Sequence, residues 1–283
     1  MKFLRQGTID ELKLFGYSGM TIKNYVEAIS AFSKYHGKSP DTLNEEDVKV
    51  FLIYSQKCGL APSSMRIRRC GILFFFNHVL KRDMDVSKVP SMKQERRLPN
   101  ILSTSEIERI FSVVTDLKEK TILMTFYATG MRLEELRLFQ LKNIDSSRMT
   151  LKFMGKGKRE RYVPLSVVLL KQLREYYKKY KPVDTFFINK FRAPFHRRSI
   201  QTIFEDSKKL AGIRKSGGVH MIRHSFATHL FESGVSIHLI QKLLGHHRIS
   251  TTEKYVHVST HTITSVQSPL DLLDFGAHME KVQ

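Results

Sequence analysis

The sequence contains little cysteine, glycine or proline and no tryptophan. Of its 283 residues, 2 are cysteine, 15 are glycine and 8 are proline. Such low counts exclude a collagen, low-complexity disorder and a disulfide scaffold, so Cys58 and Cys70 are expected to stay reduced. No apolar run approaches the ~18 residues of a membrane span, and charges interrupt the opening residues too early for a signal peptide. These absences predict a cytoplasmic protein with no membrane partner.

Negative charge is also scarce. Lysine and arginine number 47 against 27 aspartates and glutamates, a formal net charge of +20. A positive field of this size attracts polyanions, so DNA or RNA is the first expected partner. An anionic membrane surface is the alternative, but it favours one basic amphipathic helix, whereas these lysines and arginines are spread along the chain. With 41% hydrophobic residues, the chain can form one large or two modest globular domains.

The apolar pattern of residues 1–88 predicts a helical domain. Apolar residues recur at helical spacing up to a break at Gly37 and Pro40. Asn44, three residues before Asp47, is a weak capping signal for a second helix that ends near Gly59. The apolar positions of the first of these helices are Ile22, Tyr25, Val26, Ile29, Phe32 and Tyr35.

A third helix is expected to follow a cap at Ser63 or Ser64. It carries Arg66, Arg68 and Arg69 ahead of an apolar block over residues 72–79. We interpret the apolar block as core and the three arginines as a surface that faces DNA phosphates. An ordinary solvated basic face is the alternative for each arginine.

A linker without helical pattern is predicted next. Pro90 and Pro99 bracket a basic cluster that includes Arg96 and Arg97, which are further candidates for DNA contact. We place the linker at residues 89–100, a second domain at 101–267 and a tail at 268–283. A basic linker between two domains fits a clamp that closes around a duplex. The small apolar group of the tail suggests docking, in cis on its own chain or in trans on a neighbouring protomer.

The second domain is also predicted to be mainly helical. Ser103, Thr104 and Ser105 are candidate caps ahead of Glu106. A β-hairpin is the exception, because apolar and polar residues alternate after Met149 and the chain turns at the two glycines of residues 155–157. Lys156 and Lys158 are expected near the tip of this hairpin.

Chemically suggestive side chains gather in residues 220–255. His220 and Arg223 are expected to share one face of a helix. Ser236 is expected to cap a shorter helix that ends at Gly245 and exposes His246 and His247 in a turn. Residues 250–253 have the spacing of a capping box, which would start a helix that carries Tyr255.

This set of side chains suggests phosphoryl transfer. Attack on a phosphodiester needs a nucleophile, donors for the charge on the non-bridging oxygens and a proton for the departing oxygen. Tyr255 can attack, Arg132 and Arg223 can each donate paired hydrogen bonds, and a lysine at the hairpin tip can supply the proton. Histidines would donate further hydrogen bonds or accept the tyrosine proton, and these are His220 and His246.

The sequence resembles the tyrosine recombinase, or lambda-integrase, family through its Xer-like and phage or transposon integrase-like members. The resemblance covers nearly the whole chain. Its most specific parts are His220-Met-Ile-Arg-His-Ser-Phe-Ala-Thr-His-Leu230, Leu244-Gly-His246 and Ser250-Thr-Thr-Glu-Lys-Tyr255-Val-His-Val258. Upstream, Thr129-Gly-Met-Arg132-Leu-Glu-Glu-Leu136 is similar to the first arginine box of the family, and Gly155-Lys156-Gly157-Lys158 is similar to its lysine hairpin.

The resemblance implies a site-specific recombinase with a mainly α fold and a small β-sheet. Two domains would form a C-shaped clamp, a helical core-binding domain and a catalytic domain. Tyr255 would form a 3′-phosphotyrosine link, Arg132 and Arg223 would bind the scissile phosphate, and Lys156, rather than Lys158, would protonate the leaving 5′ oxygen. His220 would support acid–base chemistry and His246 would hydrogen-bond the phosphate. Neither a metal nor ATP nor any other cofactor is implied, because the protein link stores the phosphodiester.

The resemblance also implies partners. Family members usually act as a tetramer on two DNA duplexes and exchange strands through a Holliday junction. An accessory DNA-bending or directionality protein is a further candidate partner. Chromosome-dimer resolution, integration or excision of a mobile element, and plasmid resolution all use this residue set, so the DNA site and biological role stay open.

Three alternatives compete with this interpretation. His220 and His224 at i,i+4 imitate half of a zinc helix, but Glu232 and Glu253 are the only carboxylates between residues 207 and 270, too few for a metal site or a two-metal nuclease. A type IB topoisomerase-like enzyme would use the same tyrosine chemistry without a preferred site. A DNA-binding regulator would keep the fold without cutting. For His224, His229 and His257 a structural role around the site is expected.

Overall fold

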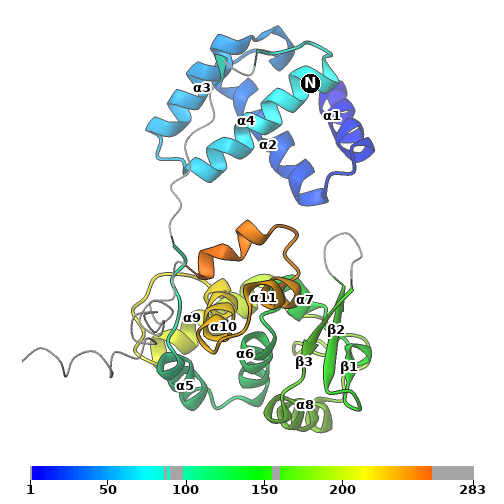
Figure 1. The fold of residues 1–283 in the computed structure, drawn as a ribbon. Helices are drawn as coiled ribbons and strands as arrows, with labels where there is room; N and C mark the ends of the chain where they lie inside the picture. Colours follow the sequence, from blue (N-terminus) through cyan, green and yellow to red (C-terminus); the bar gives the residue numbers. More distant parts are fainter. Residues whose placement is uncertain (1, 86–87, 90–97, 155–159, 257–283) are drawn as a thin grey trace, which may run out of the picture. The chain divides into compact units, whose positions relative to one another are not determined.

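The computed structural model describes residues 2–85, 88–89, 98–154 and 160–256, with the side chain of residue 2 left aside. The predicted fold class is confirmed, because the described chain is mainly helical with one small antiparallel sheet (Figure 1). Contacts along the chain divide it into two compact units, Met1–Arg96 and Arg97–Gln283. None of the described helices is long and apolar enough to cross a membrane.

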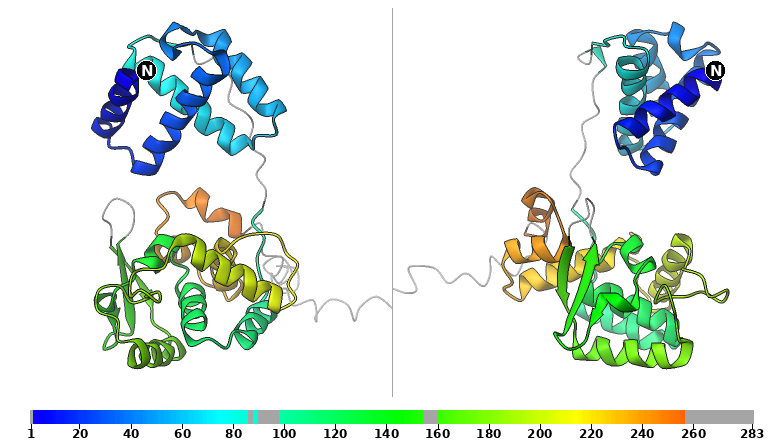
Figure 2. Two further views of the ribbon diagram at one scale, coloured as in Figure 1. Left: turned by 180° about the vertical axis from the view of Figure 1, so that it is seen from behind. Right: turned by 90° about the vertical axis from the view of Figure 1, so that its right-hand side faces the viewer.

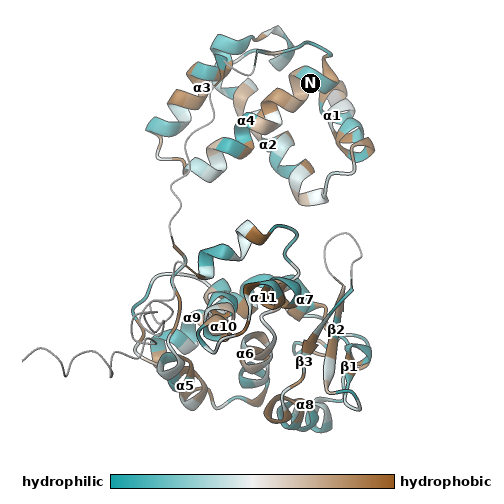
Figure 3. Ribbon diagram, in the orientation of Figure 1, coloured by the Kyte–Doolittle hydropathy of each residue, from teal (hydrophilic) through white to brown (hydrophobic). Residues whose placement is uncertain are grey.

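The first unit is a bundle of helices in which α2 packs along α4 (Figure 2). Buried apolar side chains form its core, and Figure 3 shows hydrophobic and hydrophilic residues alternating along the same helices. The core includes Phe32, Phe51, Ile72, Phe75 and Phe76. The helices are α1 (Lys2–Leu14), α2 (Gly19–His36), α3 (Glu45–Lys57) and α4 (Pro62–Phe74), with a 3-10 turn at Pro40–Thr42 and a π-helical turn at Phe75–Val79.

The ends of these helices largely follow the predicted signals. Gly37 ends α2 in the left-handed conformation, at φ 64°, which glycine adopts without strain. Asn44 and Asp47 form a complete capping box at the start of α3. The predicted serine cap of the third helix is wrong. Ser63 lies inside α4, because Pro62 occupies the first helical position, where its fixed φ already suits the helix.

The three arginines of α4 differ in their surroundings. Arg66 is exposed. Arg68 Nη1 donates to Ser55 Oγ at 2.8 Å, and Arg69 Nε donates to the carbonyl oxygen of Val89 at 2.5 Å. Both half-buried guanidinium groups thus have partners within their own unit, and a phosphate-facing role for the set stays a prediction. Arg96 and Arg97 lie outside the described residues.

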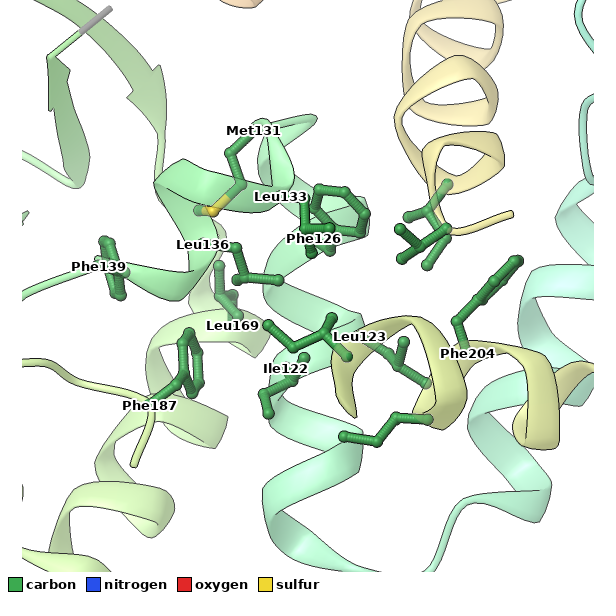
Figure 4. Packing of buried hydrophobic residues seen from close by; sticks show 14 of the residues in the cluster. Ile122, Leu123, Phe126, Met131, Leu133, Leu136, Phe139, Leu169, Phe187 and Phe204 are labelled. Atoms are coloured by element: carbon green, nitrogen blue, oxygen red, sulfur yellow. The ribbon is translucent and has the colours of Figure 1, made fainter. Parts of the chain in front are cut away.

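The second unit surrounds a large apolar core, with α6 packed against α8 and α10. Figure 4 shows Ile122, Leu123 and Phe126 of α6 directed at side chains from neighbouring elements. Ser103, one of the three predicted candidates, caps α5, and it also forms a capping box with Glu106. The helices are α5 (Thr104–Val113), α6 (Leu117–Thr129), α7 (Leu133–Arg137), α8 (Val167–Tyr180), α9 (Arg197–Leu210), α10 (His220–Glu232) and α11 (Ile237–Leu244).

The predicted hairpin is confirmed. Strands β2 (Thr150–Met154) and β3 (Glu160–Pro164) pair antiparallel, and Leu151 lies opposite Val163 with both side chains fully buried. A two-residue strand that the sequence did not predict, β1 (Ile144–Asp145), pairs with the other edge of β2. The hairpin tip, with Lys156 and Lys158, lies outside the described residues.

The segment that follows α10 is built from short elements. Ser236 caps α11 and Gly245 ends it at φ 63°, as predicted. The predicted capping box at residues 250–253 is wrong, because the structure has two 3-10 turns there, Ile249–Thr251 and Glu253–Tyr255, neither with a side-chain cap. Thr252, between the two turns, bonds the ring of His246 through its hydroxyl. The predicted tail, residues 268–283, lies outside the described residues.

Candidate active site

Side chains from four separate segments meet at the ends of α10 and α11. Arg132 precedes α7, His220 and Arg223 lie in the first turn of α10, His246 follows α11, and Tyr255 ends the second 3-10 turn. Hydrogen bonds join Arg132, Arg223 and His246 around the turn at Gly245, and the charges of the two arginines act on His220 and Tyr255. The structure therefore brings together five of the six predicted catalytic residues. The sixth, Lys156, lies outside the described residues.

Arg223 is held from inside the protein. Its side chain is almost fully buried, with 4% of the residue exposed. Nη1 donates to the carbonyl oxygen of Gly130 at 2.5 Å, and Nη2 donates to that of Leu244 at 2.8 Å. Burial and the neighbouring charge of Arg132 lower the pKa of Arg223 to about 10, so the group stays cationic at neutral pH. These contacts anchor a positive charge between α6 and α11.

Gly130 is needed at this anchor for steric reasons. It ends α6 in the left-handed conformation, at φ 55°. A Cβ atom there would lie 2.2 Å from Cδ1 of Phe226. Only glycine therefore lets α6 end against α10 with its carbonyl oxygen directed at Arg223.

Arg132 is the more accessible arginine, with 37% of its side chain exposed. Its Nη1 donates to Glu135 Oε1 at 3.1 Å, and its Nη2 donates to the carbonyl oxygen of Gly245 at 3.1 Å. Its backbone nitrogen also donates to Glu135 Oε2, at 2.7 Å. An open hollow of about 550 Å³, lined by Arg132, Met154 and His246 among others, lies beside this guanidinium group. The hollow can admit an anionic group to the arginine.

A buried ion pair connects the hairpin to this arginine. Arg161 of β3 donates through Nη1 and Nη2 to the two carboxylate oxygens of Glu135, at 2.7 and 2.6 Å. Its Nε donates to the carbonyl oxygen of Leu243 at 2.9 Å, and its guanidinium group lies over the Phe153 ring. Burial alone would raise the pKa of Glu135, but Arg161 and Arg132 together lower it below its ordinary value. Glu135 therefore stays ionised and orients Arg132.

His246 is neutral and has a defined tautomer. An arginine can only donate, so Arg223 Nη2 at 3.1 Å makes His246 Nε2 an acceptor, and the ring proton on Nδ1 points to Thr252 Oγ1 at 2.9 Å. Burial and the charges of Arg223, Arg132 and Lys254 lower the pKa of His246 to about 3. This contact also joins the turn after α11 to the segment that carries Tyr255.

Tyr255 is buried against α10. Only 1% of the residue is exposed, and it packs with Phe226, Ile240 and Leu244 in a small apolar cluster. Its hydroxyl oxygen lies 3.0 Å from Nδ1 of His224. Burial raises the pKa of Tyr255 to about 12, although the charges of Arg223 and Arg132 oppose the rise. The described arrangement thus holds a neutral phenol beside two guanidinium groups.

His220 and Lys254 complete the positive surroundings. His220 is the first residue of α10, and partial burial together with the charges of Arg223, Lys254 and Arg132 lowers its pKa. Lys254 Nζ lies 5.1 Å from the centre of the Tyr255 ring, and burial followed by the charge of Arg223 lowers its pKa. Among the described residues, no group of three or more His, Cys, Asp or Glu side chains could hold a metal ion.

Sequence reasoning missed Glu135 and Arg161, and it did not predict the contact that His224 makes. Glu135 carried one signal, its spacing of three residues from Arg132 next to a helix start. Arg161 carried another, since it alternates with the buried Val163 and so puts a charge on the inward face of a strand. His224 was predicted to have a structural role around the site, and its hydrogen bond to Tyr255 required the tertiary structure.

The arrangement is suited to a phosphodiester. Two guanidinium groups, a neutral imidazole and a phenol share one site, and the charges that act on the phenol are those of Arg223 and Arg132. Such a site stabilises the anionic transition state of attack on phosphorus. A tyrosine at its centre can act as the nucleophile.

Known proteins with similar sequences are integrases and recombinases. The model of the phage integrase family matches residues 100–262, and the model of the phage integrase N-terminal SAM-like domain matches residues 4–86. A putative integrase/recombinase y4qK of Sinorhizobium fredii is 35% identical over 95% of this chain and 89% of its own length. The tyrosine recombinase XerD of Listeria innocua is 32% identical over 86% of this chain and 90% of its own length.

Solved structures share the fold. The XerH site-specific recombinase bound to a palindromic difH substrate has a TM-score of 0.73 at 23% identity, covering 86% of this chain and 78% of that one. A lambda integrase tetramer bound to a Holliday junction has a TM-score of 0.74 at 17% identity, covering 90% of this chain and 76% of that one. With the family models and the two relatives, these findings establish that the chain belongs to the phage integrase family of tyrosine recombinases.

Proposed function

We propose that this protein is a site-specific DNA recombinase that cuts and rejoins strands through Tyr255. The observation that carries the proposal is the burial of Arg223 between two backbone carbonyls, with Arg132, His246 and Tyr255 around it. Phosphodiester transfer to a tyrosine needs this combination of fixed positive charge and a phenol. The family membership and the relatives named as recombinases support the same activity.

Each group has a definite task in the proposed cleavage step. Arg132 and Arg223 bind the non-bridging oxygens of the scissile phosphate, and His246 adds a hydrogen bond. Tyr255 Oη attacks phosphorus and forms a 3′-phosphotyrosine link. Lys156 gives a proton to the departing 5′ oxygen, and His220 supports the acid–base chemistry. Lys158 is the second candidate for the proton donor.

The resting geometry implies a rearrangement before phosphate binding. Arg223 Nη2 donates to His246 Nε2, so His246 Nε2 carries no proton that it could donate to a phosphate. The same Arg223 donor is also needed to bind the phosphate. Either His246 gains a proton or its contact with Arg223 breaks when the phosphate arrives.

Strand exchange follows from the chemistry of the covalent link. A phosphotyrosine keeps the energy of the phosphodiester bond, so the 5′ hydroxyl of a second strand can attack it without ATP. We propose that four protomers act on two duplexes and pass through a Holliday junction. The lambda integrase tetramer on a Holliday junction is a structural precedent. The reported relatives and structures do not favour a topoisomerase-like enzyme or a non-cutting regulator.

We assign the two units to two DNA-binding tasks. Residues 1–88 would be a core-binding domain, residues 101–267 the catalytic domain, and residues 89–100 a basic linker that lets both close on DNA as a clamp. The SAM-like domain match over residues 4–86 supports the first assignment. Arg66, Arg68, Arg69, Arg96, Arg97 and Lys158 are the candidates for DNA phosphate contact.

Three finer points belong to the same proposal. Residues 268–283 would dock on a neighbouring protomer within the tetramer. An accessory DNA-bending or directionality protein would select the direction of the reaction. Since chromosomal or mobile-element DNA is the proposed substrate, the protein would work in the cytoplasm.

A suicide-substrate assay tests the function. Nicked duplexes tiled across the DNA that flanks the reading frame are incubated in EDTA with wild-type protein and with Tyr255→Phe, then run on denaturing gels. The wild type should form a covalent protein–DNA adduct on particular duplexes, because the fragment beyond the nick diffuses away and prevents religation. Tyr255→Phe should form none and should bind the same DNA with unchanged affinity, since it loses only one oxygen.

Two results would contradict the proposal. An adduct formed by Tyr255→Phe would show that another residue attacks phosphorus. Tight binding of the flanking DNA by the wild type with no adduct on any duplex would favour a regulator that does not cut.

A further inference from the structure

The hydroxyl of Tyr255 has one protein partner in the described part of the chain, and that partner is His224. His224 Nδ1 lies 3.0 Å from Oη, and the two ring centres are 5.7 Å apart. His224 lies in α10 directly after Arg223, so the helix that anchors the phosphate-binding arginine also anchors the phenol. His220, one helical turn earlier, makes no such bond among the described residues.

We propose that His224 is the catalytic residue that accepts the phenol proton of Tyr255 during strand cleavage. The inference rests on the proposed role of Tyr255 as nucleophile and names the route by which that nucleophile is activated. It assigns to His224 the base function that the sequence alone left with His220 or His246.

The protonation state of His224 suits an acceptor. Burial lowers its pKa to about 3, and the charges of Lys254, His220 and Arg223 add to this effect, so the ring is neutral. A neutral imidazole with its proton on Nε2 has a free lone pair on Nδ1, at hydrogen-bond distance from Oη. The phenol has a pKa of about 12, so it carries its proton at neutral pH and must lose it in order to attack.

The step balances as follows. A lone pair of Tyr255 Oη forms the bond to phosphorus while the O–H proton moves to Nδ1 of His224, which becomes an imidazolium. The bond between phosphorus and O5′ breaks, its electron pair leaves with O5′, and the lysine ammonium proposed as donor protonates that oxygen. Religation runs the same transfers in reverse, with the imidazolium returning its proton to the phenol oxygen.

In the proposed mechanism, DNA binding raises the pKa of His224, which is too low in the free protein for an effective base. The charged groups that act on His224 in the free protein are Lys254 beside Tyr255, and His220 and Arg223 on its own helix. All of them are cationic when protonated, so all oppose an imidazolium. The scissile phosphate brings a negative charge to the same site, offsets these charges and raises the pKa of His224 toward neutrality, where a base is most effective.

The chain contains a matched control pair on the same helix. His229 Nδ1 lies 2.8 Å from the hydroxyl oxygen of Tyr127 on α6. Both pairs join a half-buried histidine of α10 to a tyrosine hydroxyl of another element. Tyr127 has no place in the proposed chemistry. His229→Phe therefore removes an equivalent structural contact and leaves the proposed proton route intact.

The kinetic test measures single-turnover adduct formation on a duplex that the wild type cuts. His224→Phe should slow the adduct by roughly 10²–10⁴-fold, the usual contribution of one acid–base group, while DNA binding is retained. His229→Phe should form the adduct at the wild-type rate. A wild-type rate for His224→Phe would overturn the proposal, as would an equal loss in the two variants.

A second substrate separates the base from the acid. When sulfur replaces the bridging 5′ oxygen, the leaving group departs without a proton, so a Lys156→Ala variant should recover activity. His224→Phe should stay slow, because the phenol must still lose its proton to a base before it attacks. Recovery of His224→Phe on this substrate would place His224 on the leaving group and overturn the proposal.

A measurement on the wild type requires no cut site. Nitrogen-15 NMR of the histidine rings reports which nitrogen of His224 carries the proton, with His224→Phe used only for assignment. An unprotonated Nδ1 is expected at neutral pH, and a protonated Nδ1 would overturn the proposal, because it could not accept. Failure of the wild type to form any adduct would refute the role of Tyr255 as nucleophile, and the tautomer would still decide whether His224 can accept.

Discussion

At the scale of single residues, the two site arginines differ in their burial and in their hydrogen-bond partners. Arg223 satisfies the carbonyl oxygens of Gly130 and Leu244 in the interior, so it contributes to folding as well as to the proposed phosphate binding. Arg132 is partly exposed beside an open hollow, and its main partner is the carboxylate of Glu135. Loss of the two side chains should therefore have the same effect on cleavage and different effects on stability.

Substitution of the arginines tests this difference. Arg223→Ala should destabilise the second unit by about 3–5 kcal/mol, because two buried carbonyls lose their donor and a cavity remains. Arg132→Ala should cost about 1 kcal/mol, since the lost contacts are partly exposed. Neither variant should form the covalent adduct. Urea unfolding, followed by tyrosine fluorescence or circular dichroism, gives the loss of unfolding free energy in each variant. Equal losses would contradict the assignment.

At the scale of elements, strand β3 is bonded directly to the segments that we propose to bind phosphate. Arg161 bonds Glu135 of α7 with two hydrogen bonds and the end of α11 with a third. A Cβ on Gly245 would already lie 3.2 Å from Cδ of Arg161, so the side chain fills the space beside this turn. The strand that leads back from the hairpin tip is thus held at a set position relative to Arg132.

A double-mutant cycle tests the coupling between these elements. Arg161→Met leaves the buried Glu135 carboxylate without its main partner and should cost about 3–5 kcal/mol. Glu135→Gln alone should also destabilise, and the double variant should recover part of the loss because no unpaired buried charge remains. Unfolding free energies of the four proteins give the coupling energy. A value near zero would mean that the pair does not link β3 to α7.

At the scale of the whole molecule, three groups respond to acid in the same direction. The folded pKa values of His224 and His246 are lowered to about 3 from an ordinary value of 6.5, and that of Glu135 is also lowered. For each group the unfolded chain binds protons at a higher pH than the folded chain does. The stability they contribute is therefore complete above the unfolded pKa and is lost as pH falls toward the folded pKa.

The expected result is a steady loss of unfolding free energy as pH falls below about 6.5, with the carboxylate adding to the loss below about 4. His224→Phe should lose less stability over this range than the wild type does, because one of the titrating groups is gone. His238→Phe, at an exposed position of α11, should follow the wild-type curve. Urea titrations at several pH values measure this slope, and a flat profile would contradict the buried, neutral state of the two histidines.

The net charge of +20 makes a prediction about DNA binding by the full chain. Binding should weaken steeply with salt, because each phosphate contact by lysine or arginine releases condensed counterions. Fluorescence anisotropy with labelled duplex DNA at increasing salt gives the slope of log affinity against log salt. Lys158→Gln should lower that slope by about one if this lysine touches a phosphate. A salt-independent affinity would rule out the proposed clamp around the DNA backbone.

Local sequence signals determined most elements of the fold. The apolar spacing and the glycine that ends α2, the capping residues of α3 and α5, and the alternation in β2 and β3 act over a few neighbouring residues, so they can be recognised in the chain itself. The catalytic candidates could be predicted for a similar reason, since His220, Arg223, His246 and Tyr255 belong to compact motifs.

The tertiary structure alone decided which side chains serve that site. Arg161 reaches Glu135 across 26 positions of sequence, and His224 reaches Tyr255 across 31. The segment of Tyr255 forms 3-10 turns despite its capping-box pattern, and its Thr252 hydroxyl bonds His246 from another segment. Hydrogen bonds between distant segments exist only when packing has excluded water and brought their partners together, so local sequence pattern does not determine them.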